Sequence, residues 1–289
     1  MSYTQILVEK TDGIAMITLN RPEKMNAYTR TMGAEITAAM DDIDADDSVR
    51  AVIFTGSGEK AFCAGADLTP EGGGQVFSDP TQVDDLSDER VRDGGGLLTL
   101  RLFESKKPLI SACNGVAVGV GATMQLAMDI RLAASHARYG FVFARRGIVP
   151  EAASSWFLPR IVGISQALEW CYSGRVFDAE EAKAGGLVRS IHGPEDLIHA
   201  AQSLAREIAD NTSSISVAMT RAMMWRLMNN DHPMEAHKID SRAIYRLSRG
   251  TDAKEGIASF LEKRRPVYPG KVSEDMPDFY PWWDEATYK

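Results

Sequence analysis

Two glycine-bearing turns are the segments of this sequence whose residue types are best suited to chemistry. Ala61–Leu68 follows an expected strand closely, and Asn114–Ala122 follows another expected strand and leads into a helix. Small residues after strands let backbone N–H groups approach a ligand, and a helix start favours developing negative charge. If the two turns meet in space, they supply two amide donors to one oxygen, which is an oxyanion hole. Taken singly, each turn can equally serve packing alone.

The elements that must position these turns alternate between strand and helix. Asp12-Gly13 is a turn dipeptide between two short apolar runs, which predicts a β-hairpin. Apolar residues then recur at helical spacing or gather in short β-branched runs. Strands are expected at about 6–8, 14–19, 49–55, 108–113, 130–134 and 139–141, and helices at 29–46 and 121–128. This alternation predicts an α/β fold.

Beyond Pro159 the sequence predicts mostly helices, at about 164–172, 178–184, 194–210, 213–229, 232–248 and 252–264. Asp178-x-x-Glu181 and Asp252-x-x-Glu255 resemble N-terminal capping patterns. The change from α/β to helical character divides the chain into a core of residues 1–205 and a helical segment of residues 206–289. The tail contains a cluster of aromatic residues at 279–283, which we expect to be packed and not exposed.

Residues 69–96 have a different composition. Glycine triplets at 72–74 and 94–96 flank an acidic stretch, which predicts a mobile excursion from the fold. Its composition is compatible with a lid over a site and with an inert surface insertion.

Overall composition excludes several classes of partner. No stretch reaches the roughly 18 uninterrupted apolar residues of a membrane span, and the N-terminus lacks the pattern of a signal peptide. The net charge of −8 argues against nucleic-acid binding. Three scattered cysteines at 63, 113 and 171 indicate buried thiols in a reducing, cytoplasmic compartment. His232 and His237 do not share a helix face as metal ligands would, so no metal site is expected.

Five motifs in order along the chain resemble those of the enoyl-CoA hydratase/isomerase (crotonase) superfamily. They are the two glycine-bearing turns, Asn20–Ala27, Asp129–Ala133 and Gly174–Ala182. The resemblance runs from about residue 5 to 265. It implies a crotonase-like ββα spiral core with a C-terminal helical segment, an acyl-CoA thioester as substrate, and no separate cofactor. It also implies a homotrimer or a dimer of trimers, in which the C-terminal segment caps CoA and forms subunit contacts.

Matched motif to motif, the two oxyanion amides of the family fall on Ala66 and Val120. Valine departs from the usual glycine at the second position, but the donor is backbone and survives the change. The two glutamates of the family's hydratases fall on Thr123 and Phe143, so both carboxylates are missing. The paired acid and base that activate water are therefore not available at those positions.

Glu151 is the carboxylate that the resemblance offers instead. The family's dienoyl-CoA isomerases and one branch of its Δ3,Δ2-enoyl-CoA isomerases place a carboxylate at this position. Its apolar neighbours in the sequence, such as Phe141, Val149 and Trp156, would desolvate the group and raise its pKa. One shuttling base suffices to move a proton from C2 to C4 of a 3-enoyl-CoA. The plain structural alternative is a carboxylate favoured by a helix start.

The resemblance also suggests residues that hold the substrate. Lys24 is a candidate for the CoA phosphates, with Ala27 and Ala64 as backbone contacts. Asp67 and Leu68 end the first turn, where Asp67 is interpreted as fixing the turn and not as an acid or base. Further candidates are Thr123, Phe143 and Trp156 for the acyl pocket, and Phe260 and Lys263 of the terminal helix for CoA.

The leading hypothesis is an enoyl-CoA isomerase with Glu151 as its single acid/base. An enoyl-CoA hydratase with atypical water positioning is the enzymatic alternative, and a hydrolase or dehalogenase with Glu151 as nucleophile is more distant. A catalytically silent acyl-CoA-binding protein is the alternative from another class.

Overall fold

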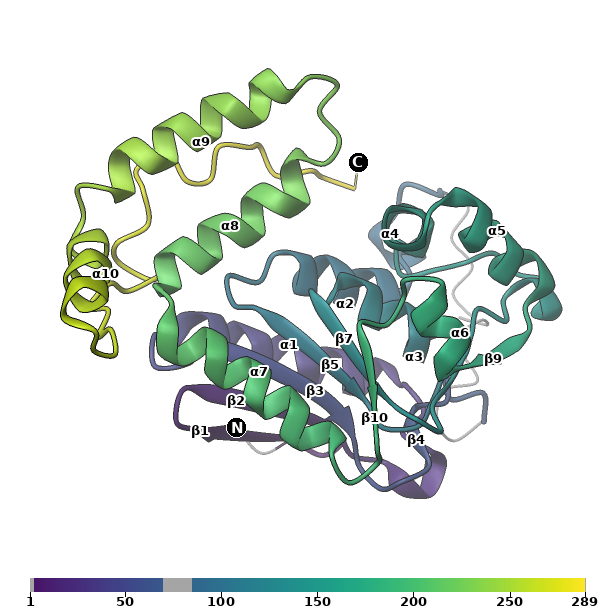
Figure 1. Cartoon of the computed structure of the whole chain (residues 1–289). Helices are drawn as coiled ribbons and strands as arrows, with labels where there is room; N and C mark the ends of the chain where they lie inside the picture. Colours follow the sequence, from purple (N-terminus) through teal and green to yellow (C-terminus); the bar gives the residue numbers. More distant parts are fainter. Residues whose placement is uncertain (1–2, 70–84, 289) are drawn as a thin grey trace.

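Six strands form the larger of two β-sheets in the computed structural model, which describes residues 3–69 and 85–288 (Figure 1). Their order across the sheet is β1 (Ile6–Thr11), β2 (Ile14–Leu19), β3 (Ala51–Gly56), β5 (Leu109–Cys113), β7 (Ile130–Ala134) and β10 (Ser190–His192). The first two strands pair antiparallel as the expected hairpin, and the other pairings are parallel. The predicted α/β fold is confirmed.

The two faces of this sheet are covered by different helices. Along β3, Val52 and Phe54 belong to one apolar cluster, which includes the buried face of α1 (Arg30–Ala45). Ala51 and Ile53 belong to a second cluster, which includes α7 (Leu197–Asn211). This alternation is the period of two that a strand buried on both faces requires. Figure 1 shows α7 in front of the sheet and α1 behind it.

The smaller sheet carries the two glycine-bearing turns. Its order is β4 (Ala61–Cys63), β6 (Val116–Val118), β8 (Arg138–Gly140) and β9 (Val176–Asp178). The first three strands run parallel, so the carboxyl ends of β4 and β6 share one edge. The turn after β6 leads into the single-turn helix α3 (Val120–Thr123), and a 3-10 turn, η4 (Met124–Ala127), continues it. The helix expected at 121–128 is therefore half α and half 3-10.

The remaining helices are α2 (Gly94–Phe103), α4 (Ser154–Val162), α5 (Ile164–Ser173), α6 (Ala179–Ala184), α8 (Ser214–Leu227), α9 (Pro233–Leu247) and α10 (Thr251–Glu262). Shorter 3-10 turns are η1 (Pro22–Lys24), η3 (Glu89–Val91) and η5 (Ala144–Arg146). Within the described residues, no helix has the length and apolar character needed to cross a bilayer.

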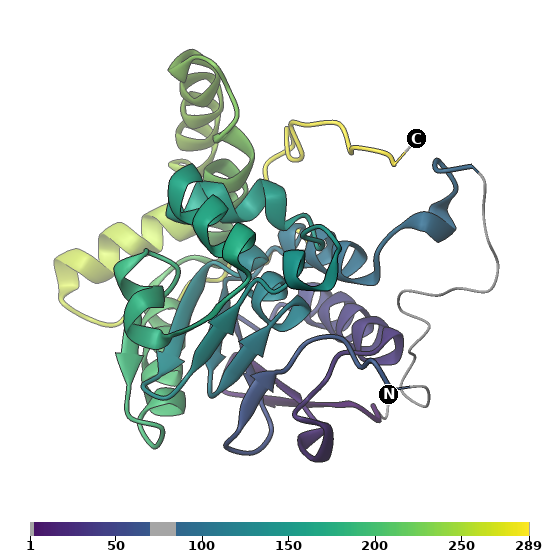
Figure 2. The same ribbon diagram turned by 90° about the vertical axis from the view of Figure 1, so that its right-hand side faces the viewer.

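The C-terminal helices form an apolar cluster of their own. Helices α8 and α9 pack with aromatic residues of the tail, among them Phe279 and Trp282, as expected. Figure 1 shows α9 and α10 projecting away from the two sheets, with α8 between α9 and the core. In Figure 2 the end of the tail lies beside the segment before α2, where the Tyr288 hydroxyl donates to the carbonyl oxygen of Leu86 at 3.3 Å. The division near residue 205 stays a prediction, and α7, which spans it, packs on the larger sheet.

Three local features differ from the predictions. The glycines at 94–96 do not flank a loop but begin α2, with Asp93 as its N-cap. The rest of the predicted excursion, residues 70–84, lies outside the described residues. Asp252 does not cap α10, because Gly250 holds that position and the Asp252 carboxylate accepts from the Gly270 amide instead. Helix α4 begins before Pro159 and contains it. The cap at Asp178 is confirmed by its bond from the Glu181 amide.

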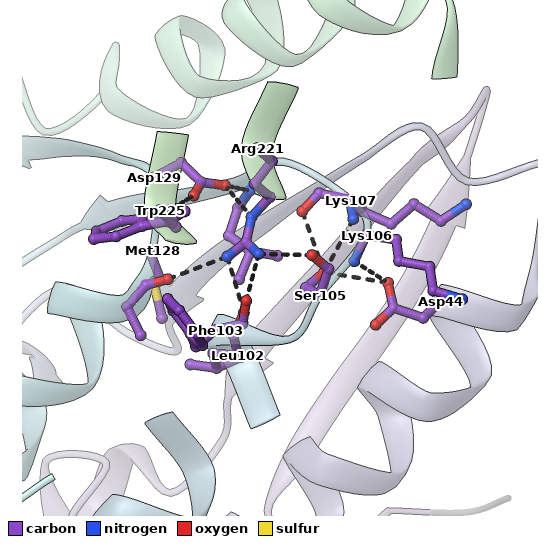
Figure 3. A network of polar contacts seen from close by, with 12 residues as sticks. Asp44, Leu102, Phe103, Ser105, Lys106, Lys107, Met128, Asp129, Arg221 and Trp225 are labelled. Carbon is purple, nitrogen blue, oxygen red and sulfur yellow. Dashed lines mark hydrogen bonds and ion pairs between the residues drawn. The ribbon is translucent and has the colours of Figure 1, made fainter. Parts of the chain in front are cut away.

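A buried guanidinium ties α8 to the core (Figure 3). Arg221 forms an ion pair with Asp129 at 2.9 Å and donates to the carbonyl oxygens of Leu102, Phe103 and Ser105 at 2.6 to 2.9 Å. The side chain is 6% exposed, so these acceptors would lose their donor and gain little water if it were removed. The Asp129 carboxylate also accepts from the Trp225 indole at 2.7 Å and from the Leu109 amide at 2.8 Å.

Replacing Arg221 with alanine is expected to lower the free energy of unfolding by about 3–5 kcal/mol, because it removes the cationic partner of the half-buried Asp129 and leaves several carbonyls without a donor. Arg242→Ala is the matched control on exposed α9 and is expected to stay within about 0.5 kcal/mol of the unmodified chain. Urea denaturation of the three proteins measures both values. Equal stabilities for the two variants would contradict the anchoring role of Arg221.

Candidate active site

The two glycine-bearing turns meet at the edge of the smaller sheet. Gly65 (φ +111°) and Gly119 (φ +54°) have backbone conformations that side chains disfavour, and a Cβ on Gly119 would lie 3.9 Å from the Gly65 Cα. The residues that follow them are Ala66 and Val120. Within the part of the chain that the structure describes, neither of these two amide nitrogens has a hydrogen-bond acceptor. Two N–H groups on adjacent turns are thus available to a ligand.

The first turn is fixed by a buried ion pair. Arg21 and Asp67 lie 2.8 Å apart, and Arg21 also donates to the carbonyl oxygen of Ala27 at 2.6 Å. Although burial opposes its ionisation, hydrogen bonds from Thr69 and Arg21 lower the pKa of Asp67 to about 2. An aspartate that is paired and ionised at all working pH values holds the turn and exchanges no proton, in line with its expected structural role.

The loop that contains the motif Asn20–Ala27 is bound to the same turn. The Asn26 side-chain amide donates to the carbonyl oxygens of Ser57 and Ala61 at 3.0 and 2.8 Å. The backbone N–H of Ala64 donates to the carbonyl oxygen of Met25 at 3.1 Å. Lys24 and Leu68 are exposed beside this junction.

Glu151 is largely buried and lies beside the second turn. Its carboxylate accepts a 2.6 Å hydrogen bond from the Thr123 hydroxyl, three residues after Val120. A Cβ added to Gly95 would lie 1.9 Å from the other carboxylate oxygen, so only glycine leaves room for the group. Burial raises the pKa of Glu151 to about 7; the Thr123 bond opposes the shift, and Asp93 adds to it.

The backbone after Glu151 is strained. Ala152 (φ 58°) and Ala153 (φ 51°) are consecutive left-handed residues, a conformation that costs roughly 1–2 kcal/mol for each residue with a Cβ. Side chains of α2 bind both backbone groups of Ala152. Its N–H donates to the Asp93 carboxylate at 3.1 Å, and its carbonyl oxygen accepts from the Thr99 hydroxyl at 2.9 Å. Strain held in place by tertiary contacts is characteristic of functional sites.

Tyr28 and Cys63 also lie near Glu151, and neither ionises near neutral pH. The buried Tyr28 hydroxyl donates to the carbonyl oxygen of Gly94 at 3.0 Å, and burial together with the charge of Glu151 holds its pKa well above the usual range. Burial raises the pKa of the Cys63 thiol to about 12. In the described chain no lysine, arginine or histidine pairs with Glu151, and no acidic, Cys or His residues gather as a metal site. Glu151 is thus the group here that titrates near neutrality.

The remaining candidate residues lie farther from this carboxylate or in the core. Phe143 is buried in the main apolar cluster. Trp156 packs edge-on against Phe103 and Phe157, with ring centroids 5.7 and 4.7 Å away. Phe260 is 81% exposed on α10, and Lys263 directly follows this helix. In Figure 1, α10 lies on the opposite side of the molecule from α4. These two residues cannot contribute to the site of their own chain.

Sequence reasoning missed the contribution of α2. Asp93, Gly95 and Thr99 all contact the turn that carries Glu151. An aspartate before a leucine-rich helical pattern is a capping signal, which could have identified the start of α2. The three glycines concealed it, because glycine disfavours helices.

Comparisons with known proteins agree with the motifs. A family model described as enoyl-CoA hydratase/isomerase matches residues 9–271. Enoyl-CoA hydratase ACTT3 of Alternaria alternata is 40% identical over 264 residues, which cover 91% of this chain and 85% of that protein. The 1,2-epoxyphenylacetyl-CoA isomerase of Escherichia coli K12 is 34% identical, over 94% of this chain and all of its own length. Of these two relatives, the one with the higher sequence identity is thus named a hydratase.

Solved structures show the same architecture. The crystal structure of an enoyl-CoA hydratase from Bacillus anthracis is 31% identical and superposes with a TM-score of 0.83, covering 93% of this chain and 100% of the other. DspI of Pseudomonas aeruginosa is 28% identical, with a TM-score of 0.83 and coverage of 93% and 98%. The chain has the crotonase fold, with two mixed sheets and C-terminal helices. It therefore belongs to the enoyl-CoA hydratase/isomerase (crotonase) family.

Proposed function

We propose that this protein shifts the double bond of a 3-enoyl-CoA to the 2-position, with Glu151 as its single acid/base. The observation that carries the proposal is the bond between Glu151 and Thr123. It places a buried carboxylate of raised pKa next to α3, the helix that begins at Val120. A base and two unoccupied amide donors thus gather where the two turns meet.

The proposed reaction follows from these groups. Ionised Glu151 removes a proton from C2, and the electron pair of that C–H bond delocalises onto the thioester oxygen. The amides of Ala66 and Val120 bind this oxygen. One such donor typically lowers the activation barrier by about 3 kcal/mol. The enolate then re-forms its carbonyl, the double bond moves to C2–C3, and protonated Glu151 returns the proton to C4. One base performs both transfers because it takes and gives the same proton.

Hydration of a 2-enoyl-CoA is the second candidate, and the name of the relative at 40% identity favours it. In that reaction Glu151 removes a proton from water, the resulting hydroxide attacks C3, and protonated Glu151 gives that proton to C2 of the enolate. The residues favour isomerisation, because Thr123 and Phe143 occupy the positions where the resemblance places the hydratase carboxylates. Phe143 is buried among apolar side chains and offers water no hydrogen bond.

The proposal extends to CoA binding and assembly. Lys24 is exposed beside the first turn, where it can meet phosphate groups. Phe260 and Lys263 can reach CoA only across a subunit boundary. The C-terminal helices expose large apolar side chains, as expected for the proposed homotrimer or dimer of trimers. These residues include Met224, Ile244, Tyr245, Ile257 and Leu261.

Glu151→Gln is expected to lower kcat for a 3-enoyl-CoA by about 10²- to 10⁴-fold, the usual contribution of general acid–base catalysis. The glutamine retains the bond from Thr123, so the affinity for a saturated acyl-CoA is expected to be unchanged. Chromatography of the products formed from 3-enoyl-CoA and 2-enoyl-CoA tests this, with exposed Glu180→Gln on α6 as the control.

Three outcomes of this assay count against the proposal. Hydration of the 2-enoyl ester at comparable efficiency would establish the hydratase. Binding of both esters without turnover by the unmodified protein would indicate a non-catalytic acyl-CoA-binding protein. Full activity of the glutamine variant would remove Glu151 from the mechanism.

The raised pKa of Glu151 predicts two opposite pH dependences. The ionised form is the base, so kcat/KM is expected to fall about tenfold per pH unit below pH 7. Stability changes the other way, because between pH 4.5 and 7 the folded protein keeps a proton that the unfolded chain has lost. The free energy of unfolding should therefore decrease as pH rises through this window, by at most about 3 kcal/mol from this group.

The difference in urea stability between Glu151→Gln and the unmodified protein isolates this contribution. The variant is expected to gain relative stability from pH 5 to pH 8. A difference that does not change with pH would show that Glu151 ionises normally.

Two neighbouring glycines provide a matched test of the position of the carboxylate. Gly95→Ala would bring a methyl group 1.9 Å from a Glu151 oxygen, which must move. The same change at Gly94 makes an ordinary contact, 3.7 Å from the Tyr28 hydroxyl. Activity is therefore expected to fall at least tenfold in Gly95→Ala and to persist in Gly94→Ala, with both variants folded by circular dichroism. Equal activities would show that the carboxylate need not lie against α2.

A further inference from the structure

We infer that Asp93 is a positioning residue, which holds the turn that carries Glu151 and keeps a fixed negative charge beside its carboxyl group. This inference rests on the proposed role of Glu151 and assigns no contact with substrate to Asp93.

One oxygen of Asp93 joins two elements. It accepts from the N–H of Gly96 in the first turn of α2 and from the N–H of Ala152 at 3.1 Å. Thr99, one helical turn further along α2, donates to the carbonyl oxygen of Ala152 at 2.9 Å. Both backbone groups of the first left-handed alanine are therefore bound by side chains of one helix. The direction of the Glu151 side chain depends on this turn, because Glu151 immediately precedes it.

The same arrangement gives the Asp93 carboxyl group more hydrogen-bond donors than that of Glu151. Two backbone N–H donors reach one oxygen, and the start of α2 adds the positive end of a helix dipole. Glu151 receives a single hydroxyl donor by comparison. Asp93 is therefore held in place by backbone groups, and Glu151 by one side chain.

Each element packed around Glu151 contributes one neighbouring group. Tyr28 comes from the loop before α1, Cys63 from β4, Thr123 from α3 and Asp93 from the start of α2. Tyr28 and Cys63 stay neutral near pH 7, and Thr123 carries no charge. In the described part of the chain, Asp93 is thus the charged group that acts on Glu151.

This charge has a direct consequence for the reaction. A base is more effective when its conjugate acid is more stable, and the negative charge of Asp93 stabilises neutral Glu151 over the ionised form. Glu151 takes the C2 proton and returns it at C4, and Asp93 takes no part in either transfer. The proton never resides on Asp93.

The test is Asp93→Asn, whose side-chain oxygen accepts the same two N–H groups but carries no charge. The acid limb of the kcat/KM profile is expected to move down by about one pH unit, with lower kcat at pH 8. The carboxyl ¹³C resonance of Glu151, assigned by its loss in Glu151→Gln, is expected to titrate at correspondingly lower pH. Asp93→Ser, a neutral cap, repeats the measurement if the asparagine variant is unstable. Asp88→Asn is the matched control, because Asp88 caps the exposed turn η3 in the same segment.

An unchanged Glu151 titration in Asp93→Asn and Asp93→Ser would overturn the inference, and a loss of thermal stability alone would reduce Asp93 to a helix cap. The proposed function fails separately, if Glu151→Gln remains active. The ¹³C titration does not depend on activity, so it tests the coupling of the two carboxyl groups even in that event.

Discussion

The buried guanidinium of Arg221 sets the position of α2, and the position of α2 sets the geometry of the candidate site. Arg221 binds the carbonyl oxygens of Leu102 and Phe103 at the C-terminal end of this helix (Figure 3). Asp93 and Gly95 at the opposite end contact the Glu151 turn. A ten-residue helix spans about 15 Å and moves as a rigid element, so a shift at one end displaces the other. The C-terminal helical segment is therefore coupled mechanically to the Glu151 turn through α2.

The strands and most helices could be predicted from the sequence because their signals are local. Burial on both faces requires continuous apolar runs such as 109–113, and Asp12-Gly13 is sufficient to specify a hairpin. The start of α2 could not be predicted in the same way. Its three glycines disfavour a helix locally, and the contact that requires Gly95 comes from Glu151, 56 residues later in the sequence. Such a requirement is tertiary, so no local pattern reports it.

The candidate site could likewise be predicted only where its residues belong to local motifs. Its motifs identified Ala66, Val120 and Glu151 as residues to examine, and the structure places the two turns together with Glu151 beside the second. The left-handed conformation of Ala152 and Ala153 was not predictable, because alanine has no preference for it. It is maintained by Asp93 and Thr99, whose contribution appears only when α2 is folded against the turn. For Phe260 and Lys263 the motif was informative, but the fold of one chain does not bring these residues to the site.

In the proposed reaction, the distribution of charge allows Glu151 to act as a base without a cationic partner. Before proton transfer, the two negative charges are on Asp93 and Glu151. After it, they are on Asp93 and the enolate oxygen, which the amides of Ala66 and Val120 stabilise, so no net charge is created in a buried site. This balance holds for the double-bond shift and for hydration alike. The two reactions differ because only hydration needs a second group, which orients water. Thr123 and Phe143 occupy the positions where the resemblance places the hydratase carboxylates, which favours the reaction that needs one base.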